Sequence, residues 1–288
     1  MINSANIPDN ELDILRTYFP KGVVALDLET TGLSPLIDKV IELSAIKITP
    51  HSVEIFSELI NPQIPIPEHT IAIHGITNSM VAKAPESKIV FPKFFAFTEK
   101  LPIIAHNAKF DIGFLVFGSH QLGLELTSGQ VYCSCQMAKK CISGVPNHKL
   151  SILAAHLEID LLNHHRAFDD ALACLRIYAR SLLSCNQEKI QLALKESFQF
   201  KIDDFKKLKE DGPSSKKISS EVFEQLKKAV TTQAPIKIRY SGGSYKNELR
   251  PIRPISLLPL PGGDVLYALC LLSNYHKSFA LHKIKEVV

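Results

Sequence analysis

The sequence lacks any long hydrophobic run. No apolar stretch among its 288 residues approaches the roughly 18 residues that a transmembrane helix needs. Residues 1–10 have neither the basic start nor the apolar stretch of an export signal. We therefore expect a soluble, cytoplasmic protein that does not contact a membrane.

The cysteines lack the spacing of a zinc site. An unexported chain of this length also has no need of a disulfide framework, so we expect reduced, mostly buried thiols. The six residues are Cys133, Cys135, Cys141, Cys174, Cys185 and Cys270.

Neither composition nor net charge is extreme. The hydrophobic fraction of 45% and the charged fraction of 22% predict a packed core, and the length favours two domains. The net charge of +4 is unevenly distributed, because residues 1–194 carry 16 Lys and Arg against 19 Asp and Glu, whereas residues 232–288 carry 8 against 3. Positive charge is therefore concentrated at the C-terminal end.

Hydrophobic patterning predicts an α/β domain over residues 10–185. A buried strand is expected at Val23–Glu29, followed by β-rich runs at Val40–Ile48 and Val53–Ile60 that form an antiparallel meander beside it. A short fourth strand is expected at Leu101–His106. These runs predict a mixed sheet flanked by helices.

Helical patterns make up most of the remainder of this domain. We expect a helical stretch before residue 100 to be broken by Pro85 and Pro92. Further helices are expected at Lys109–Gln121, at Ser134–Cys141, at Lys149–Glu158 and from Asp170 onward.

The C-terminal third has a different pattern. Residues 186–219 are rich in charged residues and serine, which predicts a linker. Residues 220–288 open with a helical pattern and continue as short β runs at Ile236–Tyr240, Val265–Leu272 and Phe279–Ile284. Glycine and proline between these runs predict a small β-barrel or a strongly bent sheet.

Two carboxylates stand out on the first predicted strand. Asp27 and Glu29 are two residues apart, so both side chains point to the same face. Like charges at that separation repel and resist desolvation, unless a cation lies between them. Mg²⁺ and Mn²⁺ prefer such hard oxygen ligands. An exposed, solvated strand end is the alternative explanation for this pair taken alone.

Two further segments place acids at expected helix starts. Asp111 ends the segment Ala105–Asp111, and Asp169 and Asp170 end the segment His165–Asp170. The helix dipole favours acids at such positions in any protein, so ordinary capping is the alternative for each segment alone.

Taken together, four motifs resemble the DEDDh family of 3′-to-5′ exonucleases, which includes the proofreading subunit of bacterial DNA polymerase III, oligoribonuclease and ribonuclease T. The resemblance covers residues 21–185 and implies an RNase H-like fold. The motifs are Asp27-Leu-Glu29-Thr-Thr-Gly-Leu, Ile73-His74-Gly75-Ile76-Thr77, His106-Asn107-Ala-Lys-Phe-Asp111 and His165-Arg-Ala-Phe-Asp-Asp170-Ala171.

The resemblance implies two bound ions of Mg²⁺ or Mn²⁺. Asp27 would contact both ions, Glu29 and Asp170 one of them, and Asp111 the other. Such a pair of ions serves both the attacking and the leaving oxygen when a phosphodiester is cleaved.

The family also has a histidine general base five residues before its last acid. Counting back from Asp170 gives His165, and counting back from Asp169 gives His164. We prefer His165, because the family pattern His-x-Ala-x-x-Asp-Ala then fits. An imidazole with a pKa near neutrality suits this role.

Five further positions match substrate contacts of the family. Thr30 and Leu33 correspond to residues that line the pocket for the terminal nucleotide. His74, Asn107 and Phe110 correspond to residues that touch the sugar, phosphate or base. Local structure is the alternative: Thr30 in a turn, His74 capping the next helix, and Asn107 fixing a loop.

Basic residues and tyrosines are interspersed along the predicted C-terminal β runs. This combination suits single-stranded nucleic acid, because cations neutralise phosphates and aromatic rings stack on bases. A small domain with a basic surface is the alternative. The candidate contacts are Arg239, Arg250, Arg253, Lys277 and Lys283.

Residues 220–288 also resemble part of the WYL domain, a small Sm/SH3-like β-barrel. The likeness lies in Arg250–Pro254, Leu266–Cys270 and Lys277–Ile284, although Asp264-Val265 stands where the naming Trp and Tyr would be. The resemblance implies a bacterial protein in which the barrel captures or senses nucleic acid.

The leading hypothesis is a two-metal-ion 3′-to-5′ exonuclease that degrades single-stranded DNA or RNA to nucleoside monophosphates, with DNA slightly favoured. An RNA-trimming exoribonuclease or oligoribonuclease is the first alternative. The second is a catalytically silent nucleic-acid-binding regulator. Retention of all four acids and the histidine argues against silence, because a degenerate site would have lost costly buried carboxylates.

Overall fold

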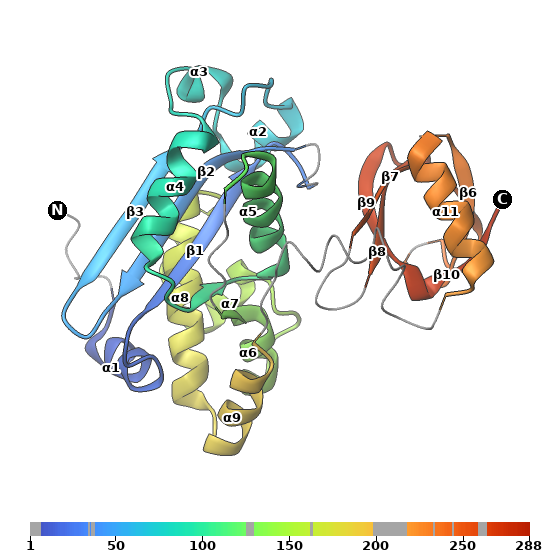
Figure 1. Cartoon of the computed structure of the whole chain (residues 1–288). Helices are drawn as coiled ribbons and strands as arrows, with labels where there is room; N and C mark the ends of the chain where they lie inside the picture. The colour runs from blue at the N-terminus through green and yellow to red at the C-terminus, as the bar shows by residue number, and fades with distance from the viewer. Residues whose placement is uncertain are drawn as a thin grey trace. The chain divides into compact units, whose positions relative to one another are not determined.

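The chain folds into two compact units, Met1–Gln199 and Phe200–Val288 (Figure 1). The computed structural model describes residues 7–33, 35, 38–124, 130–161, 164–197, 218–232, 234–243, 245–258 and 264–288. Most of the expected linker at residues 186–219 lies outside the described residues. No described helix combines the length and apolar character needed to span a bilayer.

Unit 1 contains a five-stranded mixed sheet with the strand order β3-β2-β1-β4-β5. The meander of β1, β2 and β3 is antiparallel, and β4 and β5 run parallel to β1, which confirms the expected mixed α/β fold. The strands are β1 Val23–Thr30, β2 Val40–Ile48, β3 Val53–Leu59, β4 Ile103–Ala105 and β5 Val131–Cys133. The helices are α1 Asp9–Tyr18, α2 Glu68–His74, α3 Asn78–Val81, α4 Ser87–Thr98, α5 Lys109–Gln121, α6 Ser134–Cys141, α7 Leu150–His156, α8 Ala167–Ser184 and α9 Gln187–Lys195.

Alternation along β1 determines which face carries the acids. Val23 and Ala25 pack into the core cluster that includes α1 and α8. Asp27 and Glu29 continue the same face, because successive side chains of a strand point to opposite sides. The opposite face packs against α4, where Phe56 of β3 lies 5.7 Å from the Phe94 ring. The acids therefore lie on the side of the sheet that α8 covers (Figure 1).

Prolines affect the helices of this unit differently from the expectation. Pro85 separates α3 from α4 as predicted, but α4 continues through Pro92, so that expected break is wrong. A proline inside a helix removes one backbone hydrogen bond. Here the helix also buries Val90, Phe91 and Phe94, and this packing offsets the loss.

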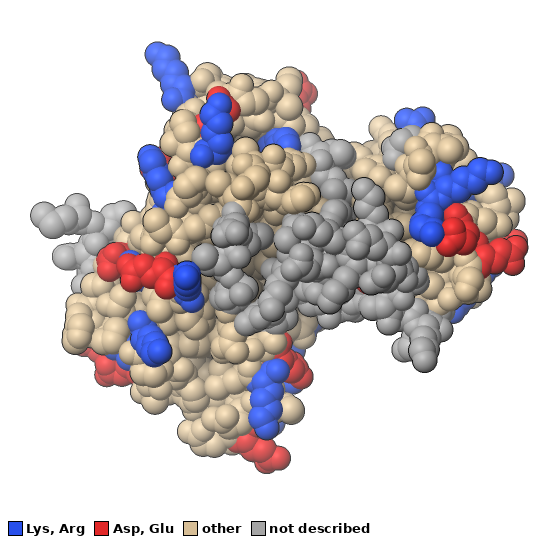
Figure 2. All heavy atoms as spheres, viewed as in Figure 1, with Lys and Arg blue, Asp and Glu red and all other residues tan. Residues whose placement is uncertain are grey.

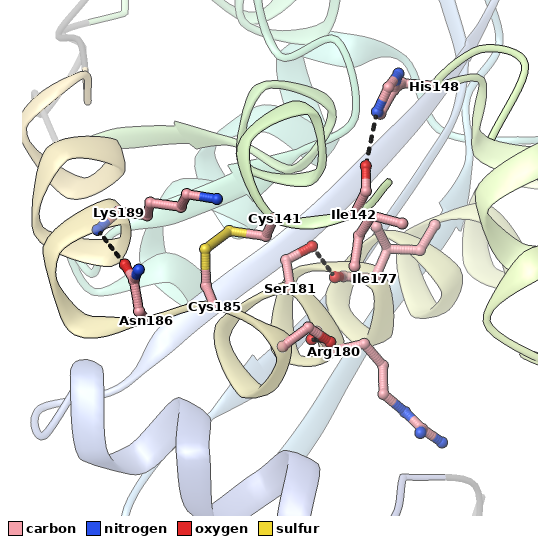
Figure 3. Close-up of a disulfide and its surroundings, with 10 residues drawn as sticks. Cys141, Ile142, His148, Ile177, Arg180, Ser181, Cys185, Asn186 and Lys189 are labelled. Atoms are coloured by element: carbon pink, nitrogen blue, oxygen red, sulfur yellow. Dashed lines mark hydrogen bonds between the residues drawn. A yellow bond between two sulfur atoms is a disulfide. The ribbon is translucent and has the colours of Figure 1, made fainter. Parts of the chain in front are cut away.

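Two cysteines form a disulfide, which corrects the expectation of six reduced thiols. Cys141 ends α6 and Cys185 follows α8, and their Cα atoms lie 5.1 Å apart (Figure 3). A separation in this range permits a disulfide. The two cysteines are 44 positions apart in the sequence, so their pairing was not apparent from it. The other four cysteines are free, two buried and two half-buried.

Unit 2 is a five-stranded antiparallel sheet with the order β10-β6-β7-β8-β9, packed against one helix. The sheet curls, because the Ala280 backbone N–H of β9 donates a hydrogen bond of 3.3 Å to the Tyr240 hydroxyl of β6, although β7 and β8 lie between these two strands. The elements are α11 Ser220–Thr232, β6 Ile236–Tyr240, β7 Leu249–Leu258, β8 Val265–Cys270, β9 Tyr275–Ala280, the short 3₁₀ helix η2 Leu281–Lys283 and β10 Ile284–Val287.

The central strand of this sheet was absent from the sequence prediction. β7 contains Pro251 and Pro254, and proline is disfavoured in central strands because it donates no ladder hydrogen bond. A register shift between Pro254 and Ser256 accommodates the second proline. The expected strand at Phe279–Ile284 was also wrong, because η2 separates β9 from β10.

A buried ion cluster fixes α1 on α8. Glu11 of α1 is fully buried and accepts hydrogen bonds from Arg176 Nε at 2.9 Å and from Arg180 Nε at 2.5 Å. Both arginines lie on α8, so the two helices are joined by charge as well as by apolar packing.

Substitution Glu11→Gln is expected to lower the free energy of unfolding of unit 1 by roughly 3–5 kcal/mol, because the loss leaves two arginines without their buried counter-charge. Urea denaturation monitored by circular dichroism measures the change. In the control, Glu54→Gln removes an exposed partner of Lys47 and should cost no more than about 1 kcal/mol. Equal effects of the two substitutions would contradict the prediction.

Candidate active site

Three acids converge at the end of β1. Oxygen atoms of Asp27, Glu29 and Asp170 all lie within 4.8 Å of one another. Asp27 and Glu29 come from β1, and Asp170 comes from the first turn of α8, which crosses the same face of the sheet. The structure thus brings together residues that are more than 140 positions apart in sequence, as the motifs predict.

Asp111 lies next to these three acids. It is 2% exposed, in the first turn of α5, and its carboxyl group forms a hydrogen bond with the backbone of Leu28 on β1. β4, which leads into this helix, runs parallel to β1 with Ala105 opposite Leu26. The two carboxyl ends therefore meet at one edge of the sheet.

Burial makes ionisation of these acids unfavourable. Desolvation, followed by the charges of neighbouring acids such as Asp170, raises the pKa of Glu29 to about 8. Burial also raises the pKa of Asp111 to about 8 and raises that of Asp27 well above its ordinary value, with Asp111 and Asp170 adding to the shift at Asp27. Such groups become readily charged when a cation binds between them.

Two histidines adjoin Asp170. Nδ1 of His164 lies 3.0 Å from Asp170 Oδ1, whereas His165 reaches Asp170 Oδ2 through its backbone N–H, at 3.3 Å. The two imidazole rings stack with centroids 3.8 Å apart. Burial, and then the neighbouring His164, lowers the pKa of His165, so its ring favours the neutral form that can accept a proton.

A buried glutamate and an arginine complete the surroundings, and the sequence analysis missed both. Glu42 of β2 lies directly opposite Glu29 of β1 and is 3% exposed. Arg166, between His165 and α8, binds its carboxylate with Nη2 at 2.6 Å from Oε1. The sequence offered two weak signals, an acid on a predicted strand and an arginine beside a motif histidine.

The turn after β1 presents Thr30 and Leu33 differently. Thr30 is buried, and its hydroxyl donates to the Gly32 carbonyl at 2.6 Å, whereas Leu33 is 63% exposed. Gly32 leaves room in this turn for the Asp38 carboxyl group, which a Cβ at this position would meet at 2.5 Å. Thr30 thus stabilises the turn, which was the alternative to substrate contact, whereas Leu33 is exposed enough to contact a substrate.

His74 has one unpartnered nitrogen. Its Nδ1 accepts a hydrogen bond from the Ile76 N–H at 3.0 Å, so Nε2 carries the proton. The residue is 5% exposed, and Nε2 is buried without a hydrogen-bond partner among the described residues. Glu42 and His165 are close enough to affect its pKa, which burial lowers.

Asn107 and Phe110 lie at the start of α5. Asn107 is exposed and has a positive φ of 57°, which asparagine tolerates better than most residues. The preceding His106 is anchored by Ser134 Oγ at 2.8 Å and by the His148 carbonyl at 3.0 Å. Phe110 is half-buried and packs on Phe114, with ring centroids 5.1 Å apart.

The basic candidates of unit 2 do not form one uniform surface. Arg253 and Lys283 are exposed, Lys277 is half-buried, and Arg239 pairs with Glu286 at 2.6 Å. On the face seen in Figure 2, basic side chains of this unit lie beside acidic ones.

Arg250 is the exception among these basic residues. It is 3% exposed, with its guanidinium 5.0 Å from the Tyr245 ring and with Nε and Nη2 lacking hydrogen-bond partners among the described residues.

Comparison with known proteins identifies the first unit. A family model described as Exonuclease matches residues 24–178, which is more than half of the chain. The chain belongs to the exonuclease family. Its exonuclease domain is of the DEDDh type, as the motifs predict, and exonucleases of this type use divalent metal ions, typically Mg²⁺. The WYL-like character of unit 2 stays a prediction.

Two curated relatives share this exonuclease domain. DNA polymerase III PolC-type of Caldanaerobacter subterraneus subsp. tengcongensis is 38% identical over 169 residues, which cover 58% of this chain and 12% of the polymerase. The same polymerase of Oceanobacillus iheyensis is 39% identical over 163 residues, covering 56% of this chain and 11% of the polymerase. The chain therefore matches about one eighth of the length of these relatives.

Two solved structures resemble this exonuclease in fold. The nuclease domain of 3′hExo, a DEDDh family member bound to rAMP, has a TM-score of 0.51 at 20% identity and covers 58% of this chain and 94% of its own. E. coli exonuclease I in complex with a dA16 oligonucleotide has a TM-score of 0.52 at 15% identity. The match covers 87% of this chain and 55% of the exonuclease I chain.

The residues present fit a divalent ion. Three carboxylate groups within 4.8 Å supply hard oxygen ligands, and burial, followed by the charges of the neighbouring acids, raises the pKa values of Asp27 and Glu29. In the metal-free exonuclease the folded state holds protons that the unfolded state releases, so its stability falls as the pH rises from the ordinary carboxyl range to about 8.

Asp27→Asn is expected to stabilise the metal-free exonuclease by on the order of 2 kcal/mol at about pH 8, with no difference at about pH 4, where the acids are protonated. Thermal denaturation in EDTA measures this. Adding Mn²⁺ should raise the melting temperature of the wild type and leave that of Asp27→Asn unchanged. Asp9→Asn on the exposed side of α1 is the control. A metal-free wild type equally stable at both pH values would argue against the acid cluster.

Proposed function

We propose that the chain is a two-metal-ion 3′-to-5′ exonuclease that hydrolyses single-stranded nucleic acid and releases nucleoside monophosphates. The observation that carries this proposal is the group of Asp27, Glu29 and Asp170 within 4.8 Å, beside His165 and Asp111. The family membership of residues 24–178 supports the class of reaction.

Four acids would hold the two ions. Asp27 would contribute to holding both ions, Glu29 and Asp170 to holding one, and Asp111 to holding the other. When bound, the ions lower the pKa of water and neutralise charge on the phosphate and the leaving 3′-oxygen.

The remaining side chains act on the substrate and on protons. The neutral imidazole of His165 accepts the proton of the attacking water at a ring nitrogen. His74 donates its Nε2–H to a substrate oxygen, which satisfies a donor that is otherwise buried without a partner. Leu33 and Phe110 offer apolar surface to the terminal nucleotide, with Thr30 holding the turn and Asn107 contacting the backbone.

DNA is the preferred substrate in this proposal. Two relatives at 38% and 39% identity are DNA polymerases, and hydrolysis of DNA requires no contact to a 2′-hydroxyl. Stronger degradation of RNA than of DNA would instead establish an exoribonuclease.

Unit 2 is proposed to bind the same strand, as a WYL-like barrel. Buried donors without partners are costly, and a phosphate group would satisfy Nε and Nη2 of Arg250, which lack hydrogen-bond partners within the described part of the chain. Arg253, Lys277 and Lys283 add positive charge, and Arg239 is available if its pair with Glu286 opens. The curl between β6 and β9 supports a barrel.

The decisive experiment uses 5′-labelled DNA and RNA oligonucleotides of equal sequence, incubated with Mn²⁺, Mg²⁺ or EDTA. We expect a ladder that shortens from the 3′ end, is stronger on DNA, and is absent with EDTA or with Asp27→Ala. Intact but retarded bands on a native gel would instead make the chain a binding protein.

The same assay separates the two histidines. His165→Gln should lower kcat by about 10²–10⁴-fold, as expected for loss of a general base. His164→Gln should have a smaller effect, because it removes one hydrogen bond to Asp170 and leaves the base in place. The reverse order would assign the role to His164.

Substrate capture by unit 2 predicts a length-dependent effect. Arg253→Gln combined with Lys283→Gln should raise KM for a long oligonucleotide and reduce the slope of log KM against log salt by about one to two. Hydrolysis of a trinucleotide should be unaffected. Lys228→Gln, an exposed lysine on α11, is the control. An equal change with the trinucleotide would show that the two residues act on unit 1.

A further inference from the structure

A single carboxylate on β2 holds the chain segment that carries two proposed active-site residues. Glu42 accepts hydrogen bonds from Arg166 Nε at 3.1 Å, from Arg166 Nη2 at 2.6 Å and from the Ala167 N–H at 2.9 Å. Glu42 and Arg166 are 124 residues apart in sequence. Two parallel bonds from one guanidinium fix direction as well as distance.

This carboxylate also caps α8. Ala167 is the first residue of the helix, and the side chain of Arg166 at the N-cap position makes no capping hydrogen bond. The first N–H groups of a helix need outside partners, and an acid here is favoured by the helix dipole. Glu42 supplies that partner from the sheet, three residues before Asp170.

The backbone at His165 depends on restraint from both sides. Its φ of 68° is in the left-handed region, which is unfavourable for a non-glycine residue. On one side its N–H is held by Asp170 at 3.3 Å. On the other side Arg166 and Ala167 are held by Glu42. Without the second restraint this segment could relax to an ordinary conformation and move the imidazole.

Arg166 also neutralises a charge that would disturb the acid cluster. Glu42 lies opposite Glu29, where two like charges on neighbouring strands repel. Both oxygens of Glu42 are engaged by Arg166 and Ala167, so this carboxylate is committed to the start of α8. Among the described residues the groups able to hold a metal ion do not include it.

We propose that Glu42 and Arg166 are a pair of positioning residues that set the place of His165 and Asp170 by fixing the start of α8 to β2. The pair touches neither substrate nor cation. This inference rests on the proposed function of His165 and Asp170.

The test compares Glu42→Gln, Arg166→Gln and the double variant in the oligonucleotide assay. Each single substitution should lower kcat by about 10–100-fold, because a small misplacement of the base is enough, with KM changed less than about threefold. The double variant should be no slower than the slower single variant, since the pair acts as one unit. Arg166→Lys should recover part of kcat.

Glu11→Gln is a matched control. It breaks a buried bridge of the same kind on the same helix, with Arg176 and Arg180, away from the acids. At a temperature where each variant is folded, it should retain wild-type kcat. Hydrogen exchange gives a readout without catalysis: amides of residues 164–170 should exchange at least about tenfold faster in Glu42→Gln and unchanged in Glu11→Gln.

The outcomes separate this inference from the proposed function. If the wild type is active and Glu42→Gln retains kcat within about twofold, or if the two single losses multiply in the double variant, the positioning pair is wrong. If the wild type has no activity, the proposed function fails, and hydrogen exchange alone tests the positioning role. Faster exchange at residues 164–170 then supports the positioning role, and unchanged exchange overturns it.

Discussion

Repulsion among buried acids is the constraint on which this structure depends. Asp27, Glu29, Asp111 and Asp170 share one end of the sheet, and Glu42 lies directly beside them. Each would be more stable in water, so the arrangement persists because the surrounding fold is rigid. The site therefore has two requirements. The strands and helices that carry the acids must be held in place by other contacts, and a positive charge must lie close to the acids.

α8 is the part of the scaffold that meets this requirement. Its inner face is buried along nearly the whole length, and it packs on both β1 and α1. Glu11 attaches it to α1 through two arginines, and the disulfide between Cys141 and Cys185 lies at its far end. Because the helix is fixed along its length, its first turn can carry Asp170 among other acids. Apolar packing at one end thus offsets electrostatic strain at the other.

The sequence could predict the acids because each follows a local rule. The two-residue spacing of Asp27 and Glu29 determines their common face, and Asp111 follows from a helix start after a short strand. Glu42 obeys no such rule, since a lone acid on a strand is ordinary. Its importance comes from a contact with Arg166 124 residues away. The disulfide and the continuation of α4 through Pro92 were not predicted for the same reason, because tertiary packing determines both.

The two histidines show how the fold can assign different roles to adjacent residues of one type. The ring of His164 is directed to Asp170, so a change in the charge of that carboxylate acts on it directly. His165 uses its backbone for the same carboxylate, which leaves its imidazole to act elsewhere. His165 combines this backbone hydrogen bond with a left-handed conformation, at a φ of 68°. A strained residue between two restraints is typical of functional sites, where local preference gives way to the geometry of the reaction.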